Sequence, residues 1–350
     1  MNSRLAEIRR FFRGIDGFLV TDMNNVRYLT GFTGSSGFLL MTRKGNILVT
    51  DFRYREQAEK EVRGLNIAIQ KGSRLGTLSN LAKRHNIKKL GFETSVSYEF
   101  FNGLSRKDFL LKPLANIVER LRSVKNAEEI KLITMAVRRA ESAFLEVLPY
   151  IKKGVRENKI ARFFEERLKK KGCSRLPFDI IVASGSNSSL PHAKPSDKKL
   201  KSGDLVLVDW GGEAGGYFSD MTRTLLIKGT DVGKKKEIYE TVLRANKKAV
   251  STISPGVDSK EIDNSARYVI KKAGYGEFFG HGTGHGVGIQ VHELPSIAMS
   301  KKGLIKENMV FTVEPGIYVP GLGGVRIEDM VVCKRKAVLL TRLSRELKVI

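Results

Sequence analysis

Two pairs of acidic residues lie in the second half of the chain, and the first acid of each pair ends an apolar run. Asp209 closes the run DLVLVD and Glu314 closes the run MVFTVE. A glycine-containing turn and a returning strand follow each run, and the returning strand carries a second acid, Asp220 or Glu328. Carboxylates held close together repel unless one is protonated or a cation lies between them. The repeated pattern therefore predicts a metal site, where Thr222, on the strand face of Asp220, would support a ligand through its hydroxyl.

Symmetric pairing within each hairpin would bring the acids face to face. The first hairpin is centred between Ala214 and Gly215, which places Asp209 opposite Asp220. Gly321 is the midpoint of the second hairpin, so its two glutamates would also be opposed. Directly opposed side chains have Cβ atoms about 4.5–5.5 Å apart. This spacing would let two cations share the four carboxylates.

The histidines complete a set of ligands for a transition metal. His85 lies in the basic stretch KRHNIKK and is expected at the surface. The other four, His192, His281, His285 and His292, lie in glycine- and proline-rich segments of the second half. Neutral imidazole with carboxylate suits Mn, Co, Fe and Zn, and a two-metal site activates water for attack on an acyl or phosphoryl group. The run HGTGHGVG lacks the spacing of a phosphate-binding loop.

The elements that position these residues fall into two parts. In the first 120 residues, four apolar runs read as strands, and the charged stretch 53–61 favours a helix between them. Strands interleaved with helices indicate an α/β domain. Asn126 before AEE predicts the N-cap of a long helix. The domain boundary is therefore expected near residue 122, giving domains 1–122 and 123–350.

The second part combines helical patterns with β-hairpins. Two further long helices are expected in KKKEIYETVLRANKKAV and DSKEIDNSARYVIKKAG. The strand-like runs are DIIVASG, DLVLVDWGG, YFSDMTRTLLI, MVFTVEPGIYV and GVRIEDMVVC. Because several form hairpins, we expect a largely antiparallel sheet with helices on one face. The fold class is α+β.

Composition and charge narrow the classes of protein. The net charge is +25, with +10 in residues 1–120 and +15 in residues 121–350. Nucleic-acid binding usually concentrates basic residues in a patch or tail, whereas here the excess is spread along the chain. No apolar stretch is long enough for a membrane span and no secretory leader is evident. Two cysteines give no disulfide framework, so a cytoplasmic location is expected.

Together, these motifs resemble the pita-bread metallopeptidase family of methionine aminopeptidase, aminopeptidase P and prolidase. The family's motifs appear in its order as LPFDIIVASGSNSSLPHAKP, DLVLVDWGG, YFSDMTRT, GHGVGIQVHE, TVEPGIY and GVRIEDMVV. The first domain is similar to the creatinase/prolidase N-terminal domain, through RYLTGFTGSSGFLLM and VTDFRYREQA. The resemblance covers nearly the whole chain.

The resemblance implies a dinuclear centre that hydrolyses peptides by a metal-activated hydroxide. Two divalent ions are implied, manganese first, with cobalt, iron or zinc also accepted. The implied ligands are Asp209, Asp220, His285, Glu314 and Glu328. Glu314 would also handle the proton of the attacking water.

The same resemblance assigns roles around that centre. His192 would position the scissile bond, and His292 would stabilise the oxyanion. His281 and Arg326 would support the ligands, together with Thr222. Phe178 would form a wall of the substrate pocket.

The substrate class leaves alternatives open. The N-terminal motifs favour an Xaa-Pro aminopeptidase acting on peptides with proline at the second position. Ser296 stands where some similar dipeptidases carry an arginine, which disfavours the alternative, an Xaa-Pro dipeptidase (prolidase). A non-catalytic binding protein of the same fold is a remote alternative, because the full ligand set is present. The resemblance also implies a homodimer, and neither a membrane nor a nucleic-acid partner is expected.

Overall fold

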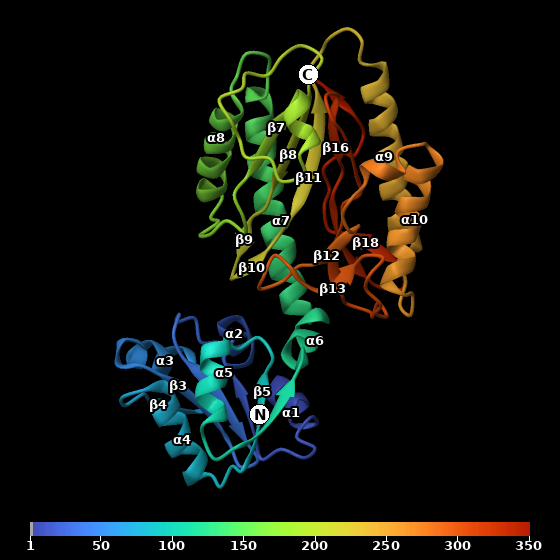
Figure 1. Ribbon diagram of the computed structural model, residues 1–350. Coiled ribbons are helices and arrows are strands. Elements are labelled where there is room, and N and C mark those ends of the chain that lie inside the picture. The colour runs from blue at the N-terminus through green and yellow to red at the C-terminus, as the bar shows by residue number, and fades with distance from the viewer. Residues whose placement is uncertain (1–2) are drawn as a thin grey trace. The chain divides into compact units, whose positions relative to one another are not determined.

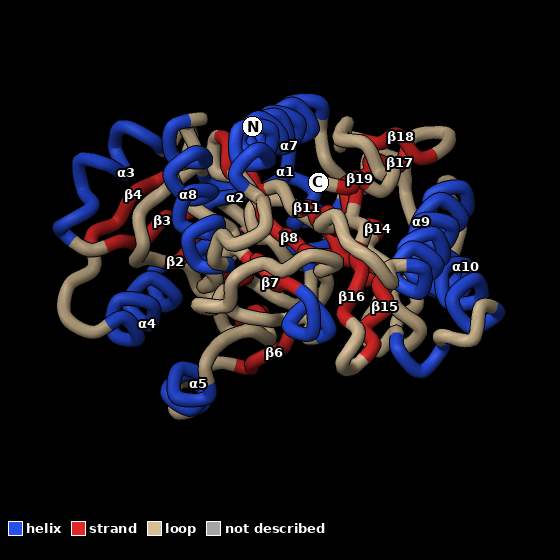
Figure 2. Tube along the Cα trace, turned by 90° about the horizontal axis from the view of Figure 1, so that it is seen from above, coloured by secondary structure: helices blue, strands red, loops and turns tan. Residues whose placement is uncertain are grey.

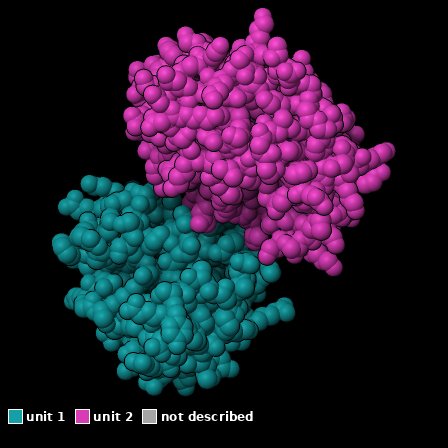
Figure 3. Space-filling view, turned by 45° about the horizontal axis from the view of Figure 1, so that its top comes forward, with its two compact units in different colours: residues 1–122 teal, residues 123–350 magenta. Residues whose placement is uncertain are grey.

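The computed structural model describes residues 3–350, and its course is drawn in Figure 1. The chain divides into two compact units, residues 1–122 and 123–350, which are coloured separately in Figure 3. Each unit has its own hydrophobic core. The two are therefore described one at a time.

Unit 1 is a mixed six-stranded sheet with helices, as expected for an α/β domain. The strand order is β4-β3-β2-β1-β5-β6, with β1, β2 and β3 antiparallel and the remaining pairs parallel. The central strands are buried, which explains their continuous apolar sequences. The strands are β1 (Gly17–Val20), β2 (Phe38–Thr42), β3 (Asn46–Thr50), β4 (Asn66–Ile69), β5 (Lys89–Glu93) and β6 (Leu110–Leu114).

Three helices of unit 1, α2, α4 and α5, begin at polar caps. Asp22 accepts hydrogen bonds from two backbone amides at the start of α2, and Ser73 and Ser97 cap α4 and α5 in the same way. The stretch expected as one helix begins with a 3₁₀ turn, Phe52–Tyr54, before α3. The helices are α1 (Ser3–Arg9), α2 (Met23–Thr30), α3 (Arg55–Glu61), α4 (Arg74–Arg84), α5 (Tyr98–Ser105) and α6 (Ile117–Ser123).

Unit 2 contains four long helices. Asn126 and Glu129 form a capping box at the start of the first, as the sequence predicts for the N-cap. The second was missed in the sequence, although its apolar residues recur at helical spacing and are buried. These helices are α7 (Ala127–Val147), α8 (Glu157–Lys170), α9 (Gly233–Thr252) and α10 (Ser259–Lys272). No helix of the described chain is both long and apolar enough to span a membrane.

The sheets of unit 2 are antiparallel apart from the pairing of β11 with β19, which confirms the expected architecture. One sheet has the order β19-β11-β8-β7, and a second has the order β13-β12-β14-β17-β18. The strands of the first sheet and its turn are β7 (Ile181–Ser184), β8 (Leu205–Trp210), β9 (Glu213–Ala214), β10 (Tyr217–Phe218), β11 (Met221–Leu226) and β19 (Lys348–Val349). The others are β12 (Gly284–Gly286), β13 (Glu293–Ile297), β14 (Val310–Val313), β15 (Gly316–Val319), β16 (Gly323–Arg326), β17 (Asp329–Cys333) and β18 (Ala337–Leu339).

The helices of unit 2 cover its strands in two pairs. Helices α7 and α8 share one hydrophobic cluster with strands β7 and β8. Helices α9 and α10 share another with β14 to β17. Seen from above, the two helix pairs flank the strands from different sides (Figure 2). The helices therefore do not cover the opposite strand faces, where a binding site can form.

Candidate metal centre

The first acidic hairpin has a different register from the one the sequence predicts. Thr222, not Asp220, lies opposite Asp209 in the pairing of β8 with β11. The turn is centred between Gly215 and Gly216, one residue later than expected, because both glycines adopt the positive φ of a tight hairpin. The pairing therefore shifts by two residues, which keeps Asp209 and Asp220 on one face but places them diagonally.

The second hairpin has the predicted register. Strands β15 and β16 pair symmetrically about Gly321, from Val319 opposite Gly323 to Gly316 opposite Arg326. The pairing of β14 with β17 continues the same symmetry on the far side. Glu314 and Glu328 lie between these two ladders at equivalent positions, as expected.

A cavity of about 510 Å³ lies over both hairpins in unit 2. It gathers nearly every residue that the sequence singled out, from segments up to 150 positions apart. Thr222 lies behind this lining, and His85 lies at the C-terminal end of α4 in unit 1. The lining includes Phe178, His192, Asp209, Asp220, His281, His285, His292, Glu314, Arg326 and Glu328.

The carboxylates of this cavity have the arrangement of a cation site. Ligand atoms of Asp220, His285 and Glu328 all lie within 4.8 Å of one another. Asp220 and Glu328 are 5% and 1% exposed, so little water compensates their charge. Buried Oδ1 of Asp209 has no hydrogen-bond partner in the described chain. This donor set of oxygens and one imidazole fits a divalent transition metal.

Crowding of these acids opposes their ionisation in the metal-free protein. Burial raises the pKa of Asp209, and the charge of Glu314 raises it further, while Arg326 lowers it. Burial and the charge of Asp209 raise the pKa of Asp220 well above its usual range. Burial and the charge of Asp220 do the same for the pKa of Glu328. A cation bound between them would remove this cost.

Glu314 and His285 form an ion pair beside the acids. His285 Nε2 lies 3.3 Å from Glu314 Oε1 and 3.6 Å from Asp220 Oδ2. Burial would raise the pKa of Glu314, but the hydrogen bond from His285 and its charge lower the pKa to about 2. Burial lowers the pKa of His285, but Glu314 and Asp220 outweigh this effect and raise the pKa to about 9. Strand β12 can approach β14 closely because residue 284 is glycine, and this brings His285 beside the acids. A Cβ atom at residue 284 would overlap the carbonyl oxygen of Thr312.

A hydrogen-bonded network holds the hairpin acids from behind. Arg326 donates to Asp209 Oδ2 at 2.6 Å and to the Thr222 hydroxyl at 3.0 Å. Thr222 in turn donates to Glu328 Oε2 at 2.7 Å. Arg326 thus links acids from both hairpins: it binds Asp209 directly and Glu328 through Thr222. The observed register makes this possible, because it places Thr222 opposite Asp209.

Tyr318 extends this network and was not singled out from the sequence. Its hydroxyl accepts from Arg326 Nη1 at 2.8 Å and lies 2.9 Å from His281 Nε2. Burial raises the pKa of Tyr318 to about 12, so the hydroxyl stays protonated. The sequence signal was its position in the motif TVEPGIY, four residues after Glu314.

The remaining histidines lie at the open side of the cavity. The rings of His285 and His292 meet edge to face, with centroids 4.1 Å apart. Burial and the charge of His285 lower the pKa of His292, which favours the neutral form of its imidazole. His192 and Phe178 line the same cavity from the segments that flank β7.

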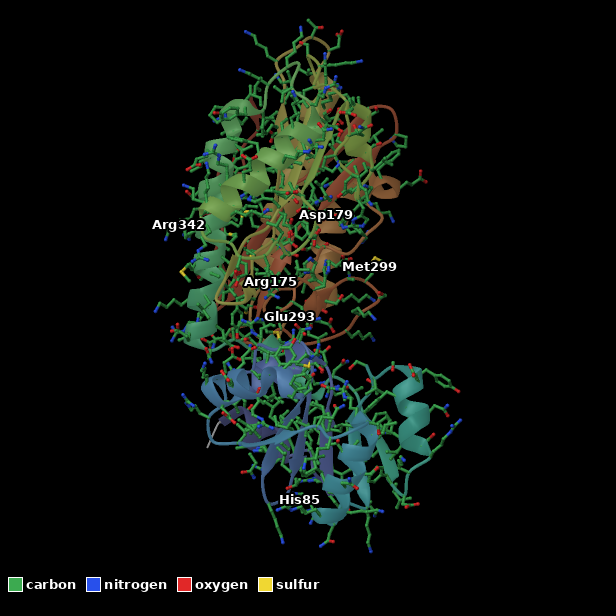
Figure 4. The ribbon with its side chains drawn as sticks, turned by 90° about the vertical axis from the view of Figure 1, so that its left-hand side faces the viewer. His85, Arg175, Asp179, Glu293, Met299 and Arg342 are labelled. Carbon is green, nitrogen blue, oxygen red and sulfur yellow. The ribbon has the colours of Figure 1, made fainter. Side chains whose placement is uncertain are left out.

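A buried ion pair, also missed in the sequence, anchors the segment that carries His292. Lys125 Nζ lies 2.7 Å from Glu293 Oε1, and their side chains are 1% and 2% exposed. Glu293 directly follows His292 and is labelled within unit 2 in Figure 4. The pair thus joins the start of unit 2 to the cavity wall across 168 positions of sequence.

Comparison with known proteins identifies the class of this site. The sequence model of metallopeptidase family M24 matches residues 131–335, and that of the Creatinase/Prolidase N-terminal domain matches residues 4–124. The chain therefore belongs to metallopeptidase family M24, whose chemistry implies divalent metal ions.

Individual relatives match almost over their full lengths. An Xaa-Pro dipeptidase of Pyrococcus horikoshii is 38% identical over 99% of both chains. The structure of an Xaa-Pro dipeptidase from Bacillus anthracis is 38% identical, with a TM-score of 0.96 over 99% of both chains. The structure of an X-Pro aminopeptidase from Thermotoga maritima is 37% identical, with a TM-score of 0.89 over 98% of this chain and 99% of that one.

Proposed function

We propose that this protein is an Xaa-Pro dipeptidase that cleaves the peptide bond before a C-terminal proline. Its similarity to dipeptidases of Pyrococcus horikoshii and Bacillus anthracis over 99% of each chain carries the proposal. These similarities favour the dipeptidase over the aminopeptidase that the sequence motifs put first. A cavity of about 510 Å³ also lies within the range of small-ligand sites.

Two divalent ions, manganese first, would be held by the four hairpin carboxylates and one imidazole. The residues proposed as ligands are Asp209, Asp220, His285, Glu314 and Glu328. When bound, the ions would act as Lewis acids: they would polarise a peptide carbonyl and lower the pKa of the attacking water, so that it loses a proton more easily.

The chain's own groups would orient the substrate and move the proton. The Glu314 carboxylate, which accepts from the Thr312 hydroxyl at 3.0 Å, would take up the proton of the attacking water. His292 would donate to the developing oxyanion, and His192 would hold the scissile bond. Arg326 and Thr222 would orient the carboxylates, with His281 acting through Tyr318.

An Xaa-Pro bond calls for a dedicated pocket, because its amide has no N–H for a general peptidase to hold. Phe178 is proposed as one wall of that pocket. The homodimer and the cytoplasmic location expected from the sequence stay predictions.

The test compares hydrolysis of Ala-Pro and Ala-Pro-Ala after chelation and after addition of Mn²⁺ or Co²⁺. We expect cleavage of Ala-Pro, little cleavage of Ala-Pro-Ala, and loss of activity on chelation. Faster cleavage of the tripeptide would instead establish an aminopeptidase. Cleavage of neither peptide with any metal would contradict both and favour a non-catalytic binding protein.

A further inference from the structure

The cavity contains a cationic side chain without a protein partner. Among residues 3–350, two lysine or arginine side chains line it, Arg326 and Lys194. The Arg326 guanidinium is buried and donates to Asp209, Thr222 and Tyr318. Lys194, by contrast, is exposed and makes no hydrogen bond or ion pair with any described residue. Its ammonium is therefore available to a ligand.

A dipeptide substrate presents a carboxylate close to the bond that is cleaved. The carboxyl carbon of proline is two bonds from the proline nitrogen, about 2.5 Å away. A residue that binds this group must therefore lie beside the residues that hold the scissile bond. Lys194 meets this condition, because it lies two positions after His192 and both side chains line the cavity.

One acid of the cavity lies outside the proposed ligand set. The metal ions would offset the charge of the four hairpin carboxylates, but Asp179 also lines the cavity, and a carboxylate there repels the free carboxylate of a substrate. Asp179 lies among the elements of unit 2 in Figure 4 and has no ion-pair partner in the described chain.

Neutral donors cannot offset that repulsion as well as a cation does. The Ser296 hydroxyl also lines the cavity, but it offers one neutral donor. A charge-assisted hydrogen bond from an ammonium is shorter and about twice as strong.

We propose that Lys194 binds the C-terminal carboxylate of the substrate and thereby selects dipeptides over longer peptides. The inference rests on the proposed dipeptidase function and assigns that function its specificity residue. In a longer peptide the proline carbonyl is part of a neutral amide, so the ammonium of Lys194 would lose its charge partner. Discrimination would then come from a single ion pair at the cavity.

The test separates the carboxylate from the rest of the substrate. Ala-Pro is compared with Ala-prolinamide, in which a neutral amide replaces the carboxylate. The variant Lys194→Met removes the charge, Lys194→Arg keeps it, and Lys199→Met is the matched control. Lys199 is exposed on the same segment and lies outside the cavity lining.

For Lys194→Met we expect KM for Ala-Pro to rise roughly 10- to 100-fold, the loss typical of a hydrogen bond to a charged group. The kcat should change little, because the contact is the same in the ground and transition states. KM for the amide should not change, and Lys194→Arg and Lys199→Met should behave like the wild type. Inhibition by free proline, but not by prolinamide, should weaken in parallel.

Two outcomes would overturn the role of Lys194. Equal loss on both substrates would indicate a general effect on the cavity, and unchanged kinetics would show that another group binds the carboxylate. A wild-type protein that prefers Ala-Pro-Ala would instead contradict the dipeptidase proposal itself. A wild type that prefers Ala-Pro while Lys194→Met keeps that preference would remove the lysine assignment alone.

Discussion

Each unit of the molecule contains strongly buried carboxylates, yet their surroundings differ. Glu93 in unit 1 is 4% exposed, comparable with Asp220 and Glu328 in unit 2. Burial raises the pKa of all three. In Glu93, however, Oε2 accepts from the backbone amides of Thr21 and Asp22, and Oε1 accepts from the Asn25 side chain.

The two buried acids of the cavity in unit 2, Asp220 and Glu328, have fewer donors than Glu93. Within residues 3–350, the Asp220 carboxylate accepts no hydrogen bond, and His285 Nε2 lies 3.6 Å from its Oδ2. The Glu328 carboxylate accepts one, from the Thr222 hydroxyl. Burial alone therefore does not distinguish a structural acid from a ligand. The number of donors does, because a buried carboxylate without them needs another source of positive charge.

The largest expected effect is at Asp220. The variant Asp220→Asn should lower kcat/KM on Ala-Pro by on the order of 10³-fold or more, beyond the 10- to 100-fold typical of residues that only support a ligand. The metal-free variant should be at least as stable as the metal-free wild type, because a repelled buried charge is removed. Kinetics, metal content and urea denaturation of the metal-free proteins test both parts. A large loss of metal-free stability would instead make Asp220 a structural acid like Glu93.

Glu93 should show the opposite pattern. In Glu93→Gln an amide N–H₂ group replaces one carboxylate oxygen and faces other hydrogen-bond donors. The free energy of unfolding should therefore fall by about 3 kcal/mol, the sum of a lost charged hydrogen bond and an unsatisfied group. Amide exchange at Thr21 and Asp22 should speed up accordingly. Exposed Glu59, replaced by Gln, is the control and should change neither quantity. Stability equal to the wild type would break the contrast between the units.

Local patterns were sufficient for much of this architecture. The N-cap at Asn126 and the centre of the second hairpin at Gly321 follow from residues within a few positions of each other. The first hairpin was predicted wrongly because its loop EAGG offers two adjacent glycines. Which pair of residues takes the positive φ values decides the register, and composition alone does not determine that choice.

Local patterns did not predict the partners of the site, and only the family resemblance pointed to Arg326 as a support for the ligands. Arg326 and Asp209 are 117 positions apart, and Lys125 and Glu293 are 168 apart. Such pairs arise from the packing of the sheets, and no period or turn motif in the sequence marks them. Residue types therefore predicted which side chains could bind a metal, whereas the fold determines which acids have donors.

The smallest expected effect is a pH dependence confined to the metal-free protein. His285 has a pKa of about 9 there, against about 6.5 for an unfolded chain. Between pH 7 and 9 the folded state thus holds a proton that the unfolded state lacks. A raised pKa of this kind gives stability that is present at pH 7 and lost as the pH rises through 9, here about 2 kcal/mol.

Asp220 and Glu328 act in the same direction, because their pKa values are also raised. A bound metal requires neutral imidazole and ionised carboxylates, so the metal-loaded protein should lack this decline. Urea denaturation at pH 7, 8 and 9, with and without Mn²⁺, measures it, and His285→Asn should remove the histidine's share. Equal slopes in both forms would show that these groups do not bind the metal, and the contrast with Glu93 would then need another cause.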